Sequence, residues 1–359
     1  MKKEHILIMR FSALGDVAMA VPVVFSLAKA YPDVRITVLS RGFARALFED
    51  LAPNVSFMEA DMKREYHGLR GLNALYRRLT AKNFTAIADF HDVMRSKYLR
   101  ARFNIDRYRV AHIDKHREGR RLLTAANGRC LQQQPTSFEN YADVLAQLGY
   151  PVKLDFHSIF PPEGGNMNLL PAVFAPKKRG EEWIGIAPFA GHEGKIYPIA
   201  LMETVVRQLA KRHPNARLFL FGRGANEDKV FPEWCKQTER CVYVGKHLET
   251  LHQELILMSH LDVMLSMDSS NMHLASLTST PVVSIWGATH PYAGFVGWGQ
   301  KASNILQADL PCRPCSIYGN KPCKRGDMEC MHLISPESVI GKIEEVLAER
   351  SSGEASTLL

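Results

Sequence analysis

Short apolar segments alternate with helix-like segments along almost the whole chain, and this alternation restricts the possible folds more than any other feature. The strand-like segments are residues 4–9, 35–40, 55–60, 84–90, 108–113, 183–189, 216–221, 242–244, 263–267 and 282–286. Strands separated by helices pair in parallel, because each crossover helix returns the chain to the starting edge of the sheet. The alternation therefore predicts an α/β fold built on parallel sheets.

The alternation is interrupted once and then restarts, which indicates two domains. Residues 161–179 contain four prolines, two glycines and a Lys-Lys-Arg run, a composition typical of an interdomain linker. We therefore expect Rossmann-like domains at 1–162 and 180–334 that face each other across a cleft. Ligands of such sheets bind beyond the carboxyl ends of the strands, so the functional residues should lie in the loops that follow strands.

The charge is distributed unevenly. Residues 1–160 contain 25 Lys or Arg and 16 Asp or Glu, whereas the remaining residues contain 20 and 21. A basic half favours an anionic partner such as nucleic acid, a membrane surface or a phosphorylated substrate, although ordinary solvated helices explain it equally well. The N-terminus lacks a signal-peptide core, and the apolar stretch 17–28 is short and contains Pro22. We therefore expect a cytoplasmic protein with reduced thiols.

Two loops that follow strands carry candidate reactive side chains. Asp16 ends the loop Arg10-Phe-Ser-Ala-Leu-Gly-Asp16, where a general base could reach a ligand. An Asp that opens a helix can equally be a simple cap. Lys195 lies in a Gly-rich loop between a strand and a helix, a position from which it could neutralise a diphosphate.

Two further loops in the second half carry candidate ligand contacts. Glu227 ends Phe221-Gly-Arg-Gly-Ala-Asn-Glu227, which lacks the third glycine of a dinucleotide fingerprint. Its carboxylate could hold ribose hydroxyls or simply favour a helix N-terminus. The polar turn Asp268-Ser-Ser-Asn271 precedes a short helix, where free backbone N–H groups suit a phosphate. His273 on that helix is either a ligand contact or a core histidine.

Four of the seven cysteines lie in one Pro- and Gly-rich segment, at Cys312, Cys315, Cys323 and Cys330. The first pair has the spacing of half a zinc knuckle, but the second pair is spaced too widely for a zinc ribbon. Structural zinc and ordinary reduced cysteines therefore both stay open. The chain contains no Asp-x-Asp pair, so one common metal–diphosphate clamp has no candidate.

Five segments, in order along the chain, resemble those of the glycosyltransferase family nine heptosyltransferases of lipopolysaccharide core synthesis. They are Ser12–Asp16, Lys195–Pro198, Gly222–Glu227, Asp268–His273 and Pro281–Pro291. The resemblance covers nearly the whole chain and implies the GT-B fold, with the acceptor on the N-terminal domain and an ADP-sugar on the C-terminal domain. It also implies that a final helix at 335–350 packs back on the N-terminal domain.

The resemblance further implies an inverting transfer that needs no metal or other cofactor. By analogy, Asp16 deprotonates an acceptor hydroxyl, while Lys195 and nearby backbone N–H groups stabilise the departing diphosphate. The implied donor-binding residues are Glu227, Asp268, Ser269, Ser270 and His273. Ser270 stands where the family usually has glycine, so its side chain could crowd the diphosphate; Tyr197 and His290 depart from the family pattern as well.

The basic first half then acquires a specific interpretation. The family's acceptors are anionic lipid-linked oligosaccharides, which arginine-rich helices could hold while bringing the enzyme to the inner face of the inner membrane. The implied acceptor-binding residues are Arg95, Arg120 and Arg121.

Three other functions compete with this interpretation. A nucleotide-sugar epimerase of the same fold would convert a donor without any acceptor. A basic nucleic-acid-binding protein with a Cys-rich zinc site would bind oligonucleotides in a salt-dependent manner. A dehydrogenase fits least, because no complete Gly-x-Gly-x-x-Gly follows a strand. The resemblance favours a glycosyltransferase that moves a sugar, expected to be heptose, from an ADP-sugar to a core acceptor, with no nucleic-acid partner.

Overall fold

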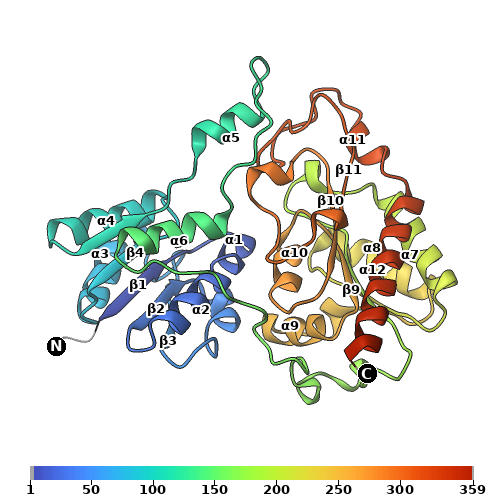
Figure 1. Ribbon diagram of the computed structural model, residues 1–359, viewed down its shortest axis with the longest axis horizontal. Helices are drawn as coiled ribbons and strands as arrows, with labels where there is room; N and C mark the ends of the chain where they lie inside the picture. The colour runs from blue at the N-terminus through green and yellow to red at the C-terminus, as the bar shows by residue number, and fades with distance from the viewer. Residues whose placement is uncertain (1–3, 358–359) are drawn as a thin grey trace. The chain divides into compact units, whose positions relative to one another are not determined.

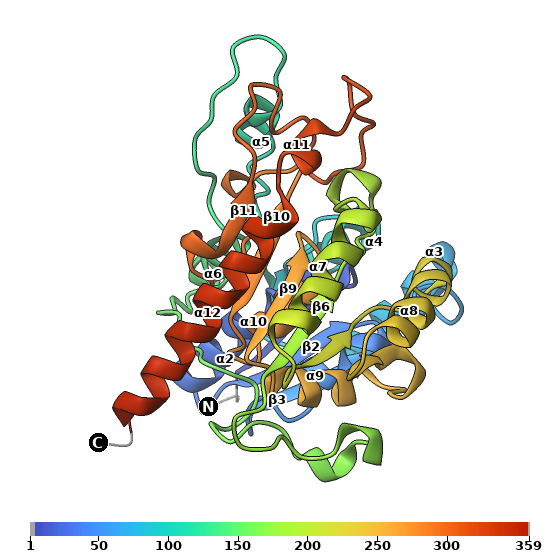
Figure 2. The same cartoon turned by 90° about the vertical axis from the view of Figure 1, so that its right-hand side faces the viewer.

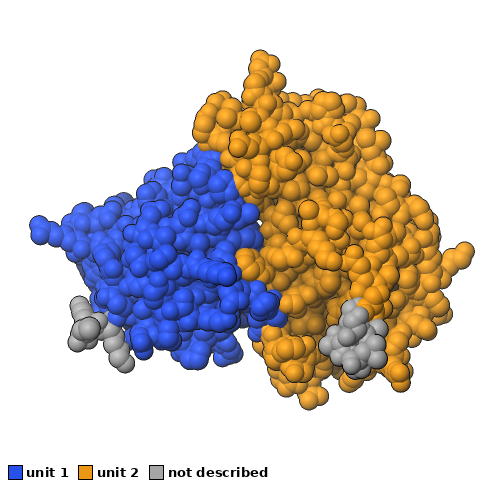
Figure 3. Space-filling view, in the orientation of Figure 1, with its two compact units in different colours: residues 1–117, 135–159 blue, residues 118–134, 160–359 orange. Residues whose placement is uncertain are grey.

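The computed structural model describes residues 4–357 of the chain, which divide into two compact α/β units. Unit 1 comprises residues up to 117 together with 135–159, and unit 2 comprises 118–134 together with the residues from 160 onward (Figure 3). No helix in this described part of the chain is long and apolar enough to cross a membrane.

Unit 1 is built on a five-stranded parallel sheet with the strand order β3-β2-β1-β4-β5 (Figure 1). Its strands are β1 (His5–Met9), β2 (Arg35–Ser40), β3 (Val55–Glu59), β4 (Ala86–Asp89) and β5 (Arg109–His112). Its helices are α1 (Leu14–Ala18), α2 (Val21–Ala30), α3 (Gly68–Thr80), α4 (Met94–Ile105) and α6 (Ser137–Gln147). All of β1 is buried, as expected for a central parallel strand covered on both faces.

Unit 2 is built on a six-stranded parallel sheet with the order β11-β10-β9-β6-β7-β8. Its strands are β6 (Trp183–Ala187), β7 (Arg217–Leu220), β8 (Cys241–Tyr243), β9 (Val263–Met267), β10 (Val282–Trp286) and β11 (Ile305–Gln307). Its helices are α5 (Arg117–Leu123), α7 (Ile199–Arg212), α8 (Ala225–Gln237), α9 (Leu251–Ser259), α10 (Ser270–Ser276), α11 (Glu329–His332) and α12 (Pro336–Thr357). The sequence pattern therefore predicted every strand except β11. This strand has only three residues and lies at the edge of the sheet, where it pairs with β10.

Helix α12 packs into the core of unit 2, and its expected packing on the N-terminal domain stays a prediction. Val339, Ile340 and Ile343 are fully buried in the same apolar cluster as residues of β6 and β9. The helix contacts α7, β9 and β10, and it lies beside them in Figure 2. Its apolar positions recur with the helical period, so a single stripe faces this sheet.

The expected first domain, 1–162, needs correction. Residues 118–134, which we call the arm, group with unit 2 even though they lie between two parts of unit 1 in the sequence. Arg129 donates a hydrogen bond to the Arg313 carbonyl at 3.0 Å, and the backbone N–H of Gln134 donates to the Tyr292 carbonyl at 2.8 Å. These bonds are long-range, so no change of local composition marks the ends of the arm.

Candidate active site

The sheet of unit 1 reverses its strand order beside β1. The chain runs from β1 outward to β2 and β3, and then returns to β4 on the other side of β1. The carboxyl edge at such a reversal is where open α/β sheets bind ligands. Residues 10–16 follow β1 and residues 90–93 follow β4, so both segments reach this edge.

Asp16 lies in the first turn of α1, and its carboxylate contacts Arg10 and the backbone of Ala13. Its Oδ2 forms an ion pair with Arg10 at 2.7 Å and accepts a hydrogen bond from the backbone N–H of Ala13 at 3.1 Å. Ala13 is the N-cap residue of α1 and Asp16 is the third residue of the helix, so Asp16 satisfies the N-cap N–H without being the cap itself. The side chain is nevertheless 33% exposed, which leaves the carboxylate open to an approaching hydroxyl.

The buried guanidinium of Arg10 orients the Asp16 carboxylate. Its side chain is only 8% exposed, and its Nη1 donates to the Phe90 carbonyl after β4 at 2.7 Å. Burial by itself would lower the pKa of Arg10, but the neighbouring Tyr141 hydroxyl and Asp16 carboxylate outweigh burial and raise that pKa. Arg10 therefore stays charged and ties the loop after β1 to the end of β4.

His91 and Lys115 complete the group at this edge. Burial, followed by the charge of Arg10, lowers the pKa of His91 to about 3, so its ring is neutral at neutral pH. The same two causes lower the pKa of Lys115, whose Nζ donates to the Asp92 carbonyl at 3.3 Å. The Asp16 carboxylate acts on both groups in the opposite direction, which shows that all of these charges lie near one another.

Sequence reasoning missed Arg10, His91 and Lys115. Each follows a predicted strand of unit 1 by only a few residues, and that position was the available signal. Part of the positive charge at this edge therefore comes from the buried Arg10 and the half-buried Lys115, which the arginine count of the helices did not reveal.

The three arginines that the sequence predicted for acceptor binding lie in different places. Arg95 is exposed on the first turn of α4, and its charge contributes to the lowered pKa of His91. Arg120 is buried in the arm, with its guanidinium 4.6 Å from the centre of the Phe295 ring. Arg121 is exposed in the arm and forms an ion pair with Glu118. Only Arg95 groups with the unit that holds Asp16, and the burial of Arg120 argues against its expected role.

Unit 2 reverses its strand order in the same way, between β6 and β9. The chain runs from β6 outward to β7 and β8, and then returns to β9 on the other side of β6. Lys195 and Asp268 lie in the loops after β6 and β9, and Glu227 lies in the first turn of α8, which follows β7. Three motifs that are far apart in the sequence thus share the carboxyl edge of one sheet, as predicted.

Lys195 and Asp268 form an ion pair across this reversal, with Nζ and Oδ2 2.9 Å apart. The Lys195 side chain is 15% exposed and that of Asp268 is 4% exposed. A buried ion pair is costly to break, because the remaining charge loses both its partner and its water. Asp268 therefore orients the Lys195 ammonium, a contact that the sequence did not reveal.

The other residues of this loop are positioned by short local contacts. Ser269 caps α10, and its Oγ lies 3.2 Å from the Oγ of Ser266. Ser270 begins the helix and is half-buried, whereas His273 is buried one turn later. The helix has only seven residues, so its dipole is small and the charge available to an anion here is mainly that of Lys195.

Glu227 folds back over the loop that precedes α8. A Cβ atom at Gly222 would lie 2.9 Å from the Glu227 Oε1, and one at Gly224 would lie 3.0 Å from its Oε2. Both glycines have strongly positive φ angles, 140° and 147°, which other residues rarely adopt. The two glycines therefore permit the close approach of this carboxylate to the loop.

Tyr197, at a position where the family usually has Trp, has a structural role. Its ring is fully buried, and its hydroxyl donates to the Ile334 carbonyl at 2.6 Å. Burial raises its pKa to about 12, so the hydroxyl keeps its proton. Tyr197 thus anchors the end of the Lys195 loop to the segment that precedes α12.

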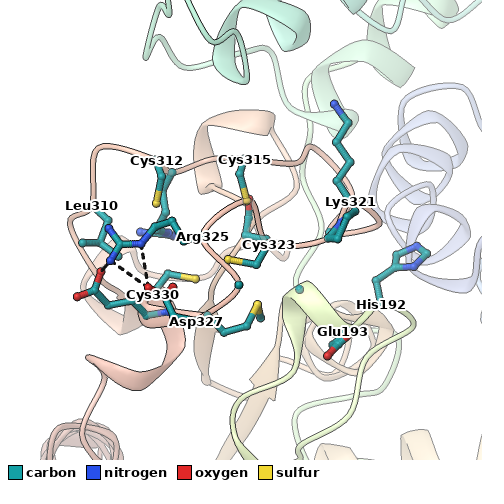
Figure 4. A pocket seen from close by; sticks show the side chains of 18 of the residues that line it. His192, Glu193, Leu310, Cys312, Cys315, Lys321, Cys323, Arg325, Asp327 and Cys330 are labelled. Carbon is teal, nitrogen blue, oxygen red and sulfur yellow. Dashed lines mark hydrogen bonds and ion pairs between the residues drawn. The ribbon is translucent and has the colours of Figure 1, made fainter.

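The four clustered cysteines line one cavity of about 470 Å³ in unit 2 (Figure 4). Burial raises the pKa of Cys330 to about 11, whereas backbone N–H groups, first that of Met328, lower the pKa of Cys323. The cavity wall also includes Glu193 and Gly194 from the Lys195 loop. This cavity therefore adjoins the candidate donor site.

Two Rossmann-like units with parallel sheets are the architecture of the GT-B glycosyltransferases, and this chain has that architecture. A model of glycosyltransferase family 9 (heptosyltransferase) matches residues 72–324, which is most of the chain. The chain therefore belongs to glycosyltransferase family 9 and is a glycosyltransferase. The fold and family predicted from the sequence are both confirmed.

Individual relatives agree over nearly the full length. The chain is 21% identical to the lipooligosaccharide heptosyltransferase 2 of Campylobacter jejuni, with 93% of this chain and 96% of the relative covered. It is 23% identical to the Escherichia coli lipopolysaccharide heptosyltransferase 3, with 96% and 99% covered. The solved structure of the E. coli heptosyltransferase WaaC with ADP has a TM-score of 0.67 at 16% identity and covers 95% of this chain and 99% of that chain.

Proposed function

We propose that this chain transfers heptose from ADP-heptose to the core of a lipopolysaccharide or lipooligosaccharide, with inversion at the anomeric carbon. The Lys195–Asp268 ion pair at the carboxyl edge of unit 2 carries the proposal, because it places one oriented cation where such sheets bind ligands. The names of the family and of both relatives support heptose as the sugar, and the ADP in the WaaC structure supports the nucleotide.

On the donor side, the reaction breaks the bond between the anomeric carbon and the diphosphate oxygen. The departing ADP gains negative charge, which the Lys195 ammonium stabilises while Asp268 keeps it aligned. Ser269 and Ser270 directly follow Asp268 in sequence, and their backbone N–H groups bind the phosphates. Glu227 accepts hydrogen bonds from the ribose hydroxyls, and the buried His273 supports the loop from within α10. This scheme uses no metal.

On the acceptor side, Asp16 is the general base. An Asp carboxylate is ionised at neutral pH, and the contacts with Arg10 and Ala13 fix its orientation. The acceptor hydroxyl transfers its proton to Asp16 while its oxygen bonds to the anomeric carbon from the face opposite ADP. The base and the leaving-group cation belong to different units, so turnover requires both units to act on the same pair of substrates.

The charges around Asp16 suit an anionic acceptor. Arg10, Lys115 and Arg95 place positive charge at this edge, which complements phosphate or acidic sugars on a core oligosaccharide. Such acceptors are linked to lipid, so we propose peripheral binding at the cytoplasmic face of the inner membrane. The basic composition of residues 1–160 supports this binding.

The direct test mixes the purified protein with a heptose-deficient core acceptor and a panel of ADP-, GDP-, UDP- and dTDP-sugars. We expect a product that is heavier by one heptose with ADP-heptose alone, and a thermal shift with ADP but not with NAD. Conversion of the donor in the absence of acceptor would point to an epimerase instead. Salt-dependent binding of oligonucleotides without any transfer would point to a nucleic-acid-binding protein.

A further inference from the structure

Two cysteines of unit 2 that do not line the cavity of the clustered cysteines lie side by side. Cys235 is in the last turn of α8, and Cys241 is the first residue of β8. Their Sγ atoms are 3.5 Å apart, and both residues are half-buried. A disulfide bond holds its sulfur atoms at about 2.05 Å, so a small rotation of the two side chains would bring these atoms to bonding distance.

The spacing of the two sulfur atoms is set by the packing of α8 on the sheet as well as by the short turn between the cysteines. Phe231 of α8 is fully buried, and its ring lies edge-on to that of Tyr243 in β8, with the ring centres 5.0 Å apart. Cys241 lies opposite Leu218 of β7, whose N–H donates to the Arg240 carbonyl at 3.1 Å. The helix and the strand are therefore both held by buried contacts, which keep the two sulfur atoms close together in the folded protein.

The pair lies at the amino edge of the sheet of unit 2, because β8 begins at Cys241 and α8 ends shortly before it. Lys195 and Asp268 follow the carboxyl ends of β6 and β9, which are at the opposite edge of the same parallel sheet. The cysteine pair is therefore outside the candidate donor site, and its chemistry does not depend on the proposed transfer.

A shared metal ion does not account for the pair. Among the residues that the structure describes, no group of three His, Cys, Asp or Glu side chains could hold a metal ion. Zinc takes four protein ligands in structural sites and three in catalytic sites. Cys235 and Cys241 supply only two ligands, so the chemistry open to them is the formation of a bond between their own sulfur atoms.

The two thiols differ in reactivity. The hydrogen bond with Cys241 outweighs burial and lowers the pKa of Cys235, and the backbone N–H of Tyr243 acts in the same direction. The same hydrogen bond, together with burial, raises the pKa of Cys241. Oxidants react with the thiolate form of a cysteine and not with the thiol. Cys235 is therefore the sulfur that reacts first, and Cys241 is the neighbouring thiol that can react with the product.

We propose that Cys235 and Cys241 form a site of reversible oxidation, at which hydrogen peroxide converts the two thiols into a disulfide. The Cys235 thiolate attacks one peroxide oxygen and the O–O bond breaks, which leaves a sulfenic acid on Cys235 and a hydroxide that takes up a proton. The Cys241 sulfur then attacks the Cys235 sulfur, the S–O bond breaks, and the hydroxyl group leaves as water with the Cys241 proton. The two sulfur atoms together lose two electrons, which reduce the peroxide to two molecules of water. An added dithiol restores both thiols by exchange.

The test treats the full, folded chain with increasing hydrogen peroxide until the exposed Cys130 is oxidised, then blocks the remaining thiols and digests the protein with trypsin. Trypsin cuts after Lys and Arg, so Cys235 is recovered in the peptide 230–236 and Cys241 in the peptide 241–246. We expect these two peptides to be joined, with a mass two hydrogens below their sum, and to separate after treatment with dithiothreitol. If the two peptides stay separate once Cys130 is oxidised, the proposal is overturned.

A matched pair of variants assigns the order of reaction. In Cys241→Ser the sulfenic acid on Cys235 has no thiol to react with, so dimedone should label Cys235 during oxidation. In Cys235→Ser the label on Cys241 should be at least about tenfold lower, because little of this thiol is ionised. Circular dichroism checks the folding of both variants.

If either variant does not fold, dimedone added to the unaltered chain during oxidation should label Cys235 in preference to Cys241. Equal labelling of the two cysteines, or stronger labelling of Cys241, would overturn the assignment of Cys235 as the first sulfur to react. These measurements need no transferase activity, so their outcome is independent of the proposed function.

Discussion

The two units share a sheet topology, but they differ in which partner of an ion pair at the sheet edge is the more exposed. Each has a parallel sheet whose strand order reverses beside a central strand, and each places a lysine or arginine against an aspartate there. In unit 1 the carboxylate of the pair is exposed and the cation, Arg10, is buried. In unit 2 the carboxylate is the more buried partner and the cation, Lys195, reaches further toward solvent. Unit 1 thus presents a base, and unit 2 presents a positive charge.

The largest loss of activity is expected for Asp16→Asn, which removes the proposed base and keeps the shape of the side chain. We expect transfer to fall by about 10²–10⁴-fold. Binding of ADP, measured by calorimetry, should be unchanged, because ADP is assigned to unit 2. Asp33→Asn, at an exposed turn, is the control and should be fully active. Near-normal turnover by Asp16→Asn would exclude it as the base.

Lys195→Ala removes the corresponding cation of unit 2. Loss of the cation should lower kcat by about 10²–10³-fold, because the charge on the departing ADP is no longer stabilised. Asp268 is left without its partner, so we also expect a lower Tm in a thermal scan. The exposed Lys211→Ala serves as the control. Equal activity of the two variants would remove Lys195 from the mechanism.

Histidines with lowered pKa values should make the stability of the protein depend on pH. The pKa of His91 is lowered to about 3, far below the 6.5 of an unfolded histidine, because burial disfavours its charged form. Below pH 6.5 the unfolded chain takes up a proton that the folded chain excludes, so the free energy of unfolding falls as pH drops toward 3. Each unit of difference in pKa corresponds to roughly 1.4 kcal/mol.

His91→Gln should therefore flatten the dependence of Tm on pH between pH 6.5 and pH 4. His290→Gln, in unit 2, should have a weaker effect of the same sign, since the pKa of His290 is lowered only to about 4 by burial and then by Arg313. If His91→Gln and the unaltered chain have the same pH profile of Tm, the lowered pKa of His91 does not contribute to the pH dependence of stability.

Variants of Arg95 and Arg121 test which of the two units binds the acceptor. Arg95→Ala should raise the acceptor KM by about two- to fivefold, as expected for an exposed charge that contacts an anion. Arg121→Ala should change it less, because its guanidinium is paired with Glu118 in the arm. Steady-state kinetics at two salt concentrations test both variants. A larger effect from Arg121→Ala would move the acceptor surface to the arm.

Ser270→Gly has the smallest expected effect. Removal of the side chain at the start of α10 should tighten ADP binding by about two- to threefold if Ser270 crowds the phosphates, with no change in acceptor KM. Weaker ADP binding would mean that the hydroxyl is a useful donor. Calorimetry with ADP distinguishes the two outcomes.

Much of the fold was predictable because it depends on local periodicity. Alternating apolar strands and helices identified both sheets, and the segments that follow β6, β7 and β9 contain Lys195, Glu227 and Asp268. The ion pair between Lys195 and Asp268 was not predictable, because strand order decides which loops become neighbours. The packing of α12 on the sheet of unit 2 was not predictable either, since an apolar stripe does not specify the sheet that it covers.

The polar groups at the sheet edge of unit 1 were missed for a different reason. Composition drew attention to exposed arginines on helices, whereas Arg10, His91 and Lys115 are defined by burial at the sheet edge. Burial of a polar residue depends on long-range packing, which a single sequence does not display.

The arm has a consequence for protein engineering. The chain passes from one unit to the other at three places, near residues 117, 134 and 159, so the units are interlaced in sequence. A fragment that starts at residue 160 would leave the Tyr292 and Arg313 carbonyls without their donors from Gln134 and Arg129, and Phe295 without Arg120. Hybrids that exchange donor halves between relatives should therefore carry residues 118–134 with the C-terminal half, as a transplanted insert within the other parent's N-terminal half.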